Sequence, residues 1–136
     1  MEPFVEIVER ETETVRRTYG LTLRALTVVD VLLLGSSYAL RFEVDRDGLA
    51  LSYIDAVGEE LRSYELFGFF MRERRDRPTF ATHPPEPSDE IRAEVTAMVR
   101  HLLGAGADIL SGQKAWQSQH GFAVPARGLA LTELHT

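Results

Sequence analysis

Residues 38–53 read Tyr-Ala-Leu-Arg-Phe-Glu-Val-Asp-Arg-Asp-Gly-Leu-Ala-Leu-Ser-Tyr, and this stretch decides the fold. Apolar and polar side chains alternate on both sides of a short Asp-Arg-Asp-Gly segment, and that period is typical of half-buried β-strands. Aspartate bonds to its own backbone in turns and glycine tolerates positive φ, so residues 45–48 predict the turn of a β-hairpin. One face of the hairpin should be buried, and it carries Leu40, Phe42, Val44, Leu49, Leu51 and Tyr53.

The segments on either side of the hairpin extend it into a meander. Residues 56–59 predict a second turn, followed by a third antiparallel strand over 61–64 and then a short helix or strand end over 65–71. Upstream, residues 21–34 predict one or two strands, the second buried on both faces, with the apolar run from Val28 to Leu34 in the core. Residues 35–37 predict a turn. Four prolines within 74–87 predict a surface loop.

Helical patterns flank these strands. Residues 3–19 predict one amphipathic helix that Gly20 ends, and Ser88 is placed to cap a second long helix. Residues 109–112 predict a connector, 113–120 a short helix carrying Trp116, and 122–136 a loose tail. The order predicts a single α+β domain over 1–136, with C-terminal helices on one face of a sheet of three to five antiparallel strands. The core-facing stripe of the second long helix is Ile91, Val95, Met98, Val99, Leu102 and Leu103.

Composition narrows the classes of function. The chain has 136 residues, no cysteine and a formal net charge of −6. A negative charge disfavours binding to the nucleic-acid backbone, and the apolar run is too short to span a membrane. The absence of cysteine and of a basic, apolar leader makes a cytoplasmic location our expectation.

The acidic side chains gather in residues 43–60, where six acids stand against one arginine for a local charge of −5. Asp45, Asp47 and Asp55 lie at strand ends, so we expect their carboxylates to be solvent-exposed and to face a basic protein partner. The alternative is a solvated face that serves only solubility and turn geometry.

A second candidate surface is the aromatic cluster of Tyr64, Phe67, Phe69 and Phe70. Four aromatics in seven residues cannot all face one small core from a regular helix or strand, so Tyr64, Phe67 and Phe70 are further candidate partner-binding residues. The alternative places the whole cluster in the core.

No catalytic or metal-binding motif is complete. Glu43, Asp45, Asp47 and Gly48 match positions of a calcium loop, but Ile54 stands where that loop needs a bidentate glutamate. The four histidines show no metal-ligand spacing, and we expect His101 to be partly exposed. No nucleophile elbow, phosphate loop or dinucleotide fingerprint occurs. We therefore expect no catalytic residue, metal or cofactor.

Two short motifs carry a resemblance to known proteins. They are residues 38–48 and the later Ile-Leu-Ser-Gly-Gln-Lys-Ala-Trp of residues 109–116. The chain resembles small uncharacterised bacterial α+β proteins, some of them immunity-like proteins of toxin–antitoxin neighbourhoods. In these a helix precedes a meander, and an Ile-Leu-x-Gly-Asp motif followed by an aromatic ends the domain. Gln113 stands here where the acid is usual. The resemblance implies a binding role and carries over no catalytic residue.

The sequence thus favours a non-enzymatic protein-binding domain, with an immunity-type inhibitor of a basic partner as its sharpest form. Two alternatives stay open. One is a small hydrolase or transferase whose site assembles from distant residues. The other is a homo-oligomeric structural subunit, such as a homodimer, that associates through the aromatic cluster.

Overall fold

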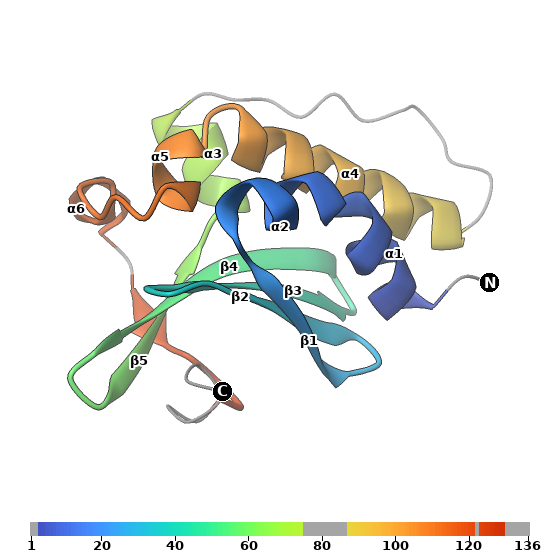
Figure 1. The fold of residues 1–136 in the computed structure, drawn as a ribbon, viewed down its shortest axis with the longest axis horizontal. Coiled ribbons are helices and arrows are strands. Elements are labelled where there is room, and N and C mark those ends of the chain that lie inside the picture. Colours follow the sequence, from blue (N-terminus) through green and yellow to red (C-terminus); the bar gives the residue numbers. More distant parts are fainter. Residues whose placement is uncertain (1–2, 75–86, 122, 130–136) are drawn as a thin grey trace.

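The computed structural model describes residues 3–74, 87–121 and 123–129, with no account of the side chains of residues 87–89. The chain is an α+β domain in which helices lie on one side of a single antiparallel sheet (Figure 1). The strands are β1 (Thr22–Thr27), β2 (Asp30–Leu34), β3 (Ala39–Asp45), β4 (Gly48–Val57), β5 (Glu60–Glu65) and β6 (Val124–Pro125). The helices are α1 (Phe4–Glu11), α2 (Glu13–Tyr19), α3 (Phe67–Glu73), α4 (Pro87–Leu103), α5 (Ala107–Leu110) and α6 (Gln117–His120).

The predicted hairpin is confirmed as β3 and β4, in a register that pairs Phe42 with Leu51 and Asp45 with Gly48. At the tip the Asp47 amide donates to Asp45 Oδ1 at 2.7 Å, and Gly48 has a φ of 106°. Of the six residues expected on the buried face, the four farthest from the tip are fully buried. Val44 and Leu49 are only half-buried because they adjoin the exposed turn.

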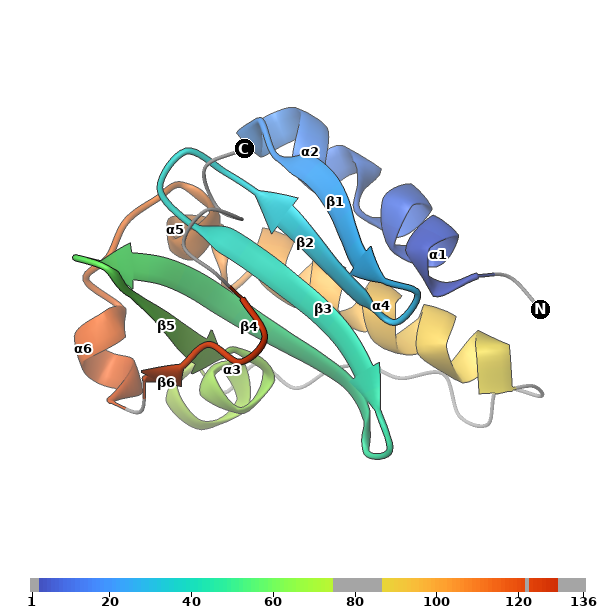
Figure 2. The same cartoon turned by 90° about the horizontal axis from the view of Figure 1, so that it is seen from below.

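The sheet has six strands among the described residues, one more than the largest number predicted, and they follow each other in chain order as a meander (Figure 2). Residues 21–34 form two strands, and β2 is buried on both faces as expected. The apolar run nevertheless extends beyond the core. Val28 and Val29 form the turn between β1 and β2 and are 79% and 44% exposed. The prediction that these two residues lie in the core was therefore wrong.

The N-terminal segment is two helices, where one was predicted. Thr12 separates them, and its buried Oγ1 donates to the carbonyl of Val8 at 2.6 Å. A threonine that bonds back to its own helix competes with the regular ladder and bends the helix. Gly20, with a φ of 69°, ends α2 as expected.

The long helix α4 packs across the sheet and beside α1. Glu94 Oε2 accepts a hydrogen bond from the Leu49 amide at 3.1 Å, which ties α4 to the β3–β4 hairpin. Val95, Met98, Val99 and Leu102 are buried as predicted. Leu103 is 40% exposed, because twelve residues after Ile91 it has rotated about 120° from that residue's side of the helix.

Two apolar clusters hold the fold together. The larger lies between the helices and the sheet. The smaller lies on the opposite face, here called the open face, where Ala39, Ile54 and Leu61 contact the half-buried Leu34, Ala126 and Leu129.

The C-terminal segment contributes to the smaller cluster. Residues 124–125, within the tail that was expected to be loose, form β6 on the outer edge of β5. Residues 130–136 lie outside the described part of the chain.

Several shorter segments also differ from expectation. Residues 107–110 form α5 rather than a connector, and the helix expected over 113–120 begins only at Gln117. Most of the loop expected over 74–87, and the capping role of Ser88, fall outside the described residues and side chains. Within the ranges that are described, no helix is long and apolar enough to cross a membrane.

An ion pair joins α3 to α5. Arg74 donates two hydrogen bonds to Asp108, at 2.6 and 2.8 Å, and a third to the carbonyl of Ala105. The hydrogen bonds from Arg74 hold the pKa of Asp108 below its ordinary value. Because the pair is partly exposed, we expect it to contribute about 1 kcal/mol.

Replacing Arg74 therefore has a pH-dependent consequence. A lowered carboxylate pKa stabilises the fold above the unfolded value of about 3.9, and that stabilisation is lost as the pH falls through the folded value. Arg74→Met should lower the melting temperature at pH 7, and the difference from wild type should shrink below pH 4. A difference of equal size at pH 3 and pH 7, measured by circular dichroism, would contradict the ion-pair account.

Candidate functional site

Asp55 is a buried carboxylate near the end of β4. Side chains alternate along a strand, so Asp55 shares the helix-facing side of the sheet with Tyr53. It is 4% exposed, so the expectation that its carboxylate is solvent-exposed was wrong. The same alternation that buries Leu51 and Tyr53 also points the side chain of residue 55 inward, where the C-terminal segment covers it.

Lys114 is the cationic partner of Asp55, and it comes from the segment between α5 and α6. Its ammonium donates to Asp55 Oδ2 at 3.2 Å, to Tyr53 Oη at 2.9 Å and to the Ser37 carbonyl at 3.0 Å. Gln117 Nε2 donates to the same carboxylate oxygen at 2.7 Å. All three donors of the ammonium are thus used within the chain. We call Tyr53, Asp55, Lys114 and Gln117 the clamp cluster.

The tyrosines around the clamp cluster are poor acid–base groups. Burial, followed by the negative charge of Asp55 and the proximity of Tyr64, raises the pKa of Tyr53 far above its ordinary value. Burial, together with neighbouring Tyr53 and Tyr19, raises the pKa of Tyr38 to about 12, and its hydroxyl donates to the Leu110 carbonyl at 2.7 Å. Both phenols therefore stay protonated near neutral pH. The clamp cluster joins the C-terminal segment to the sheet.

The aromatic candidates lie mainly inside the molecule. Tyr64 faces Trp116, with ring centroids 5.2 Å apart, and both are buried. Phe70 is fully buried and Phe67 is half-buried. The alternative of core use therefore holds for Tyr64 and Phe70. A β-strand followed at once by a helix turns these side chains toward one core, which neither element alone could do.

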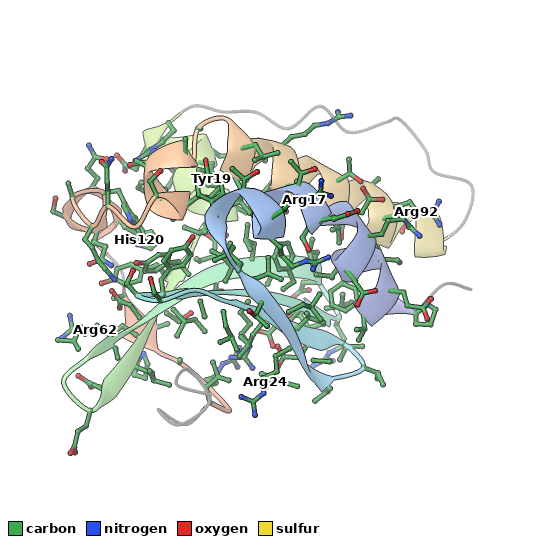
Figure 3. All side chains as sticks on the ribbon, viewed as in Figure 1. Arg17, Tyr19, Arg24, Arg62, Arg92 and His120 are labelled. Carbon is green, nitrogen blue, oxygen red and sulfur yellow. The ribbon has the colours of Figure 1, made fainter. Side chains whose placement is uncertain are left out.

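The two histidines in the described part of the chain, His101 and His120, also lie against this aromatic core. His101 is 4% exposed, so its expected partial exposure was wrong: α3 covers it, and its ring stacks on Phe70 with centroids 5.7 Å apart. His120, labelled in Figure 3, places Nε2 2.7 Å from the Glu65 carbonyl and stacks on Phe69. Across the described ranges no three or more acidic or histidine side chains gather in a way that could hold a metal ion.

The acidic stretch of the sequence does not form one surface. Asp45 and Asp47 are exposed at the β3–β4 tip, whereas Glu59 and Glu60 are exposed around the β4–β5 turn. These turns are separated by the ten residues of β4, which span about 30 Å. The acids of residues 43–60 thus lie in four separate places: at the two ends of the sheet, in the buried clamp cluster and on the open face.

One end of the sheet does bring candidate residues together. The Val44 amide donates to the Val29 carbonyl at 2.9 Å, so the β1–β2 turn and the β3–β4 tip are adjacent. Val28, Val29, Asp45 and Asp47 are all exposed there, and we call these four residues the tip surface. The β-branched side chains of these valines are typical of strands, so the sequence pattern predicted a strand here and not an exposed turn. Asp30, which interrupts the apolar run, was the available signal of a turn.

A hollow of about 320 Å³ lies between the end of α2, the β2–β3 turn and the turn after α5. The residues that line it include Thr18, Ser36, Ser37 and Ser111, together with Tyr19 at the end of α2. Figure 3 labels Tyr19. A serine nucleophile requires an adjacent base. The described residues that line the hollow include no carboxylate or imidazole, so the hollow does not favour the hydrolase alternative.

Known proteins provide no further guide to the site. Comparison of the chain with protein-family models, with curated proteins and with solved structures found no match in any of the three.

Proposed function

We propose that this protein is a non-enzymatic protein-binding domain, with an immunity-type inhibitor of a basic partner as its sharpest form. The observation that carries the proposal is the tip surface, where two adjacent turns expose two valines beside two aspartates. A hairpin tip needs polar residues for its turn but has no local need for exposed β-branched side chains. Because Val28 is 79% exposed, it buries little apolar area in that position and contributes little to the stability of the fold.

The chemistry of the tip surface indicates the kind of partner. Apolar side chains supply area that is favourable to bury, and carboxylates at its margin attract cationic groups and fix orientation. A partner with a basic rim around a small apolar patch fits both features. Charge complementarity of this kind acts mainly on the association rate and on specificity.

The ionisable groups in the interior support a binding role over an enzymatic one. Asp55 and Lys114 bond to each other, and Asp30 is held by Arg41 at 2.9 and 2.6 Å on the open face. These groups are used to join segments of the chain. The homo-oligomer alternative is weakened, because Tyr64 and Phe70 of the aromatic cluster are buried in the core.

The proposal is tested by removing the charge of the tip surface alone. Asp45→Asn/Asp47→Asn should change the free energy of unfolding by only about 0.5 kcal/mol per residue, because both side chains are exposed. The variant and wild type would be used to capture a partner from the source cells, and association with the purified partner would then be followed by stopped flow. We expect the variant to associate several-fold more slowly and with a weaker dependence on salt.

The matched control is Glu59→Gln/Glu60→Gln, which removes the same charge from the opposite end of β4. It should associate at close to the wild-type rate. Equal slowing by both variants would mean that only net charge matters, and an unchanged rate for the tip variant would remove the tip surface from the interaction.

A further inference from the structure

The open face of the sheet is covered in part by the chain's own C-terminal segment. Residues 123–129, here called the strap, cross this face beside β5 (Figure 2). Ala39 and Ile54 of the smaller apolar cluster are fully buried, and Ala126 and Leu129 of the strap pack against that cluster. A bare apolar sheet face of this kind is a ready interaction surface, so what covers it decides whether it is accessible.

The first part of the strap is bound as an extended peptide would be, and residues 127–128 then form a turn in which Gly128 has a φ of 69°. It pairs with β5 through Ser63–Val124 and Arg62–Pro125, and the Ala126 amide donates to the Leu61 carbonyl at 3.1 Å. Beyond the ladder, Arg41 Nη1 donates to the Arg127 carbonyl at 2.6 Å. The contacts recognise backbone groups and two apolar side chains three residues apart. The turn between Ala126 and Leu129 brings both side chains to the same face, so a short strand followed by a turn of this kind could make all of these contacts.

Within the described residues, the ladder between the strap and β5 covers two residues, whereas β5 has six. Five of the seven strap residues are exposed, and only Ala126 and Leu129 are half-buried. Strands in globular proteins usually run to five or six residues, so a longer strand could pair with more of β5 than the strap does.

Pro125 gives the strap a second property. The bond between the Ala126 amide and the Leu61 carbonyl makes residue 125 the neighbouring, non-hydrogen-bonded position of the antiparallel ladder. The N–H that proline lacks would therefore point away from β5. The strap fills the edge of the sheet without offering a new edge on its outer side.

We propose that the outer edge of β5 and the adjoining open face form an acceptor site for a strand-and-turn segment of a partner protein, which the strap occupies until the partner displaces it. The partner segment is a short strand followed by a tight turn that contains glycine. It has apolar side chains on either side of that turn, three residues apart, and no proline on its β5-bonding positions. The tip surface uses other turns of the sheet, so this inference and the proposed function can fail independently.

The test uses a fluorescein-labelled peptide with the sequence of residues 123–129, Ala-Val-Pro-Ala-Arg-Gly-Leu, and the full chain. Ala126→Asp/Leu129→Asp weakens the strap and leaves every acceptor residue unchanged. The tethered strap of wild type competes at an effective concentration of about millimolar. We therefore expect the peptide to bind the variant at least tenfold more tightly than wild type in fluorescence polarisation. Equal binding to both chains, or equal binding of a peptide carrying the same two aspartates, would overturn the proposal.

A second arm does not depend on the stability of that variant. The chain contains no cysteine, so Ser63→Cys/Val124→Cys introduces only one possible disulfide, between neighbours of the ladder. Oxidation locks the strap on the acceptor site, and reduction releases it. The peptide should bind the oxidised chain at least tenfold more weakly than the reduced chain. Equal affinity in the two states would show that the strap and the peptide do not share a site.

Discussion

Phe42→Ala should lower the free energy of unfolding by about 3–5 kcal/mol. Phe42 is fully buried on β3, a central strand, where it pairs with Val31 of β2 on one side and Leu51 of β4 on the other. Truncation removes the ring from a site whose neighbours are fixed by two ladders, so the cavity cannot close by local movement. In a chain of this size the melting temperature should fall by about 10–20 °C.

Val28→Ala is the matched control, because it also shortens an apolar side chain of the sheet but at a largely exposed position. Its effect should stay within about 0.5 kcal/mol. Urea unfolding followed by circular dichroism measures both variants. A loss below 1 kcal/mol for Phe42→Ala, or equal losses for the two variants, would show that β3 does not lie at the centre of the core.

The elements that the sequence predicted well are those whose signal is local. The hairpin of residues 38–53 alternates with a period of two and carries its own turn residues, so neither its register nor its buried face depends on distant segments. The stripe of α4 is similarly regular. By contrast, β6 has two residues, one of them proline, and it exists only because β5 offers an edge. A strand of that kind leaves no periodicity to detect.

The clamp cluster shows a different limit. Strand alternation from Leu51 and Tyr53 already placed Asp55 on the buried face, but its charge made a wet position the more natural expectation. Strand alternation, and not the charge of the side chain, predicted the observed burial of Asp55. Lys114, which makes that burial tolerable, lies 59 residues farther along the chain, so no spacing rule connects the two. His101 is similar, because the aromatic side chains of α3 that cover it are remote in sequence.

The distribution of charge changes the functional argument. A stretch with a local charge of −5 suggests one acidic surface when it is read along the chain. In the fold, the length of β4 separates the two exposed acidic turns of this stretch. The buried Asp55 pairs with Lys114, and the half-buried Glu43 lies 3.8 Å from Arg41.

Two separate surfaces remain for a partner. The tip surface has two aspartates beside two exposed valines, with Arg46 exposed in the same turn, and the β4–β5 turn has Glu59 and Glu60 beside the exposed Val57. An interaction through the tip surface should depend on the position of charge more than on net charge.

Lys114→Met should lower the free energy of unfolding by about 3 kcal/mol. The substitution removes the ammonium that bonds Asp55, Tyr53 and the Ser37 carbonyl, and it leaves a carboxylate that is 4% exposed with Gln117 as its remaining partner. The expected loss is at the lower end for a broken buried ion pair, because the Lys114 side chain is itself 41% exposed and water can enter in its place. Urea unfolding measures the change.

A double-mutant cycle separates the clamp from a simple loss of packing. Asp55→Asn keeps the shape of the side chain and an oxygen that can accept from Gln117, but it removes the charge that Lys114 compensates. In the Lys114→Met background it should therefore recover 1 kcal/mol or more, whereas in the wild-type background it should destabilise the fold. Additive effects, or a loss below 0.5 kcal/mol for Lys114→Met alone, would mean that Lys114 does not hold the C-terminal segment on the sheet. In that case its ammonium would be available to an external anionic ligand, and the interior of the protein would have to be reconsidered as a binding site.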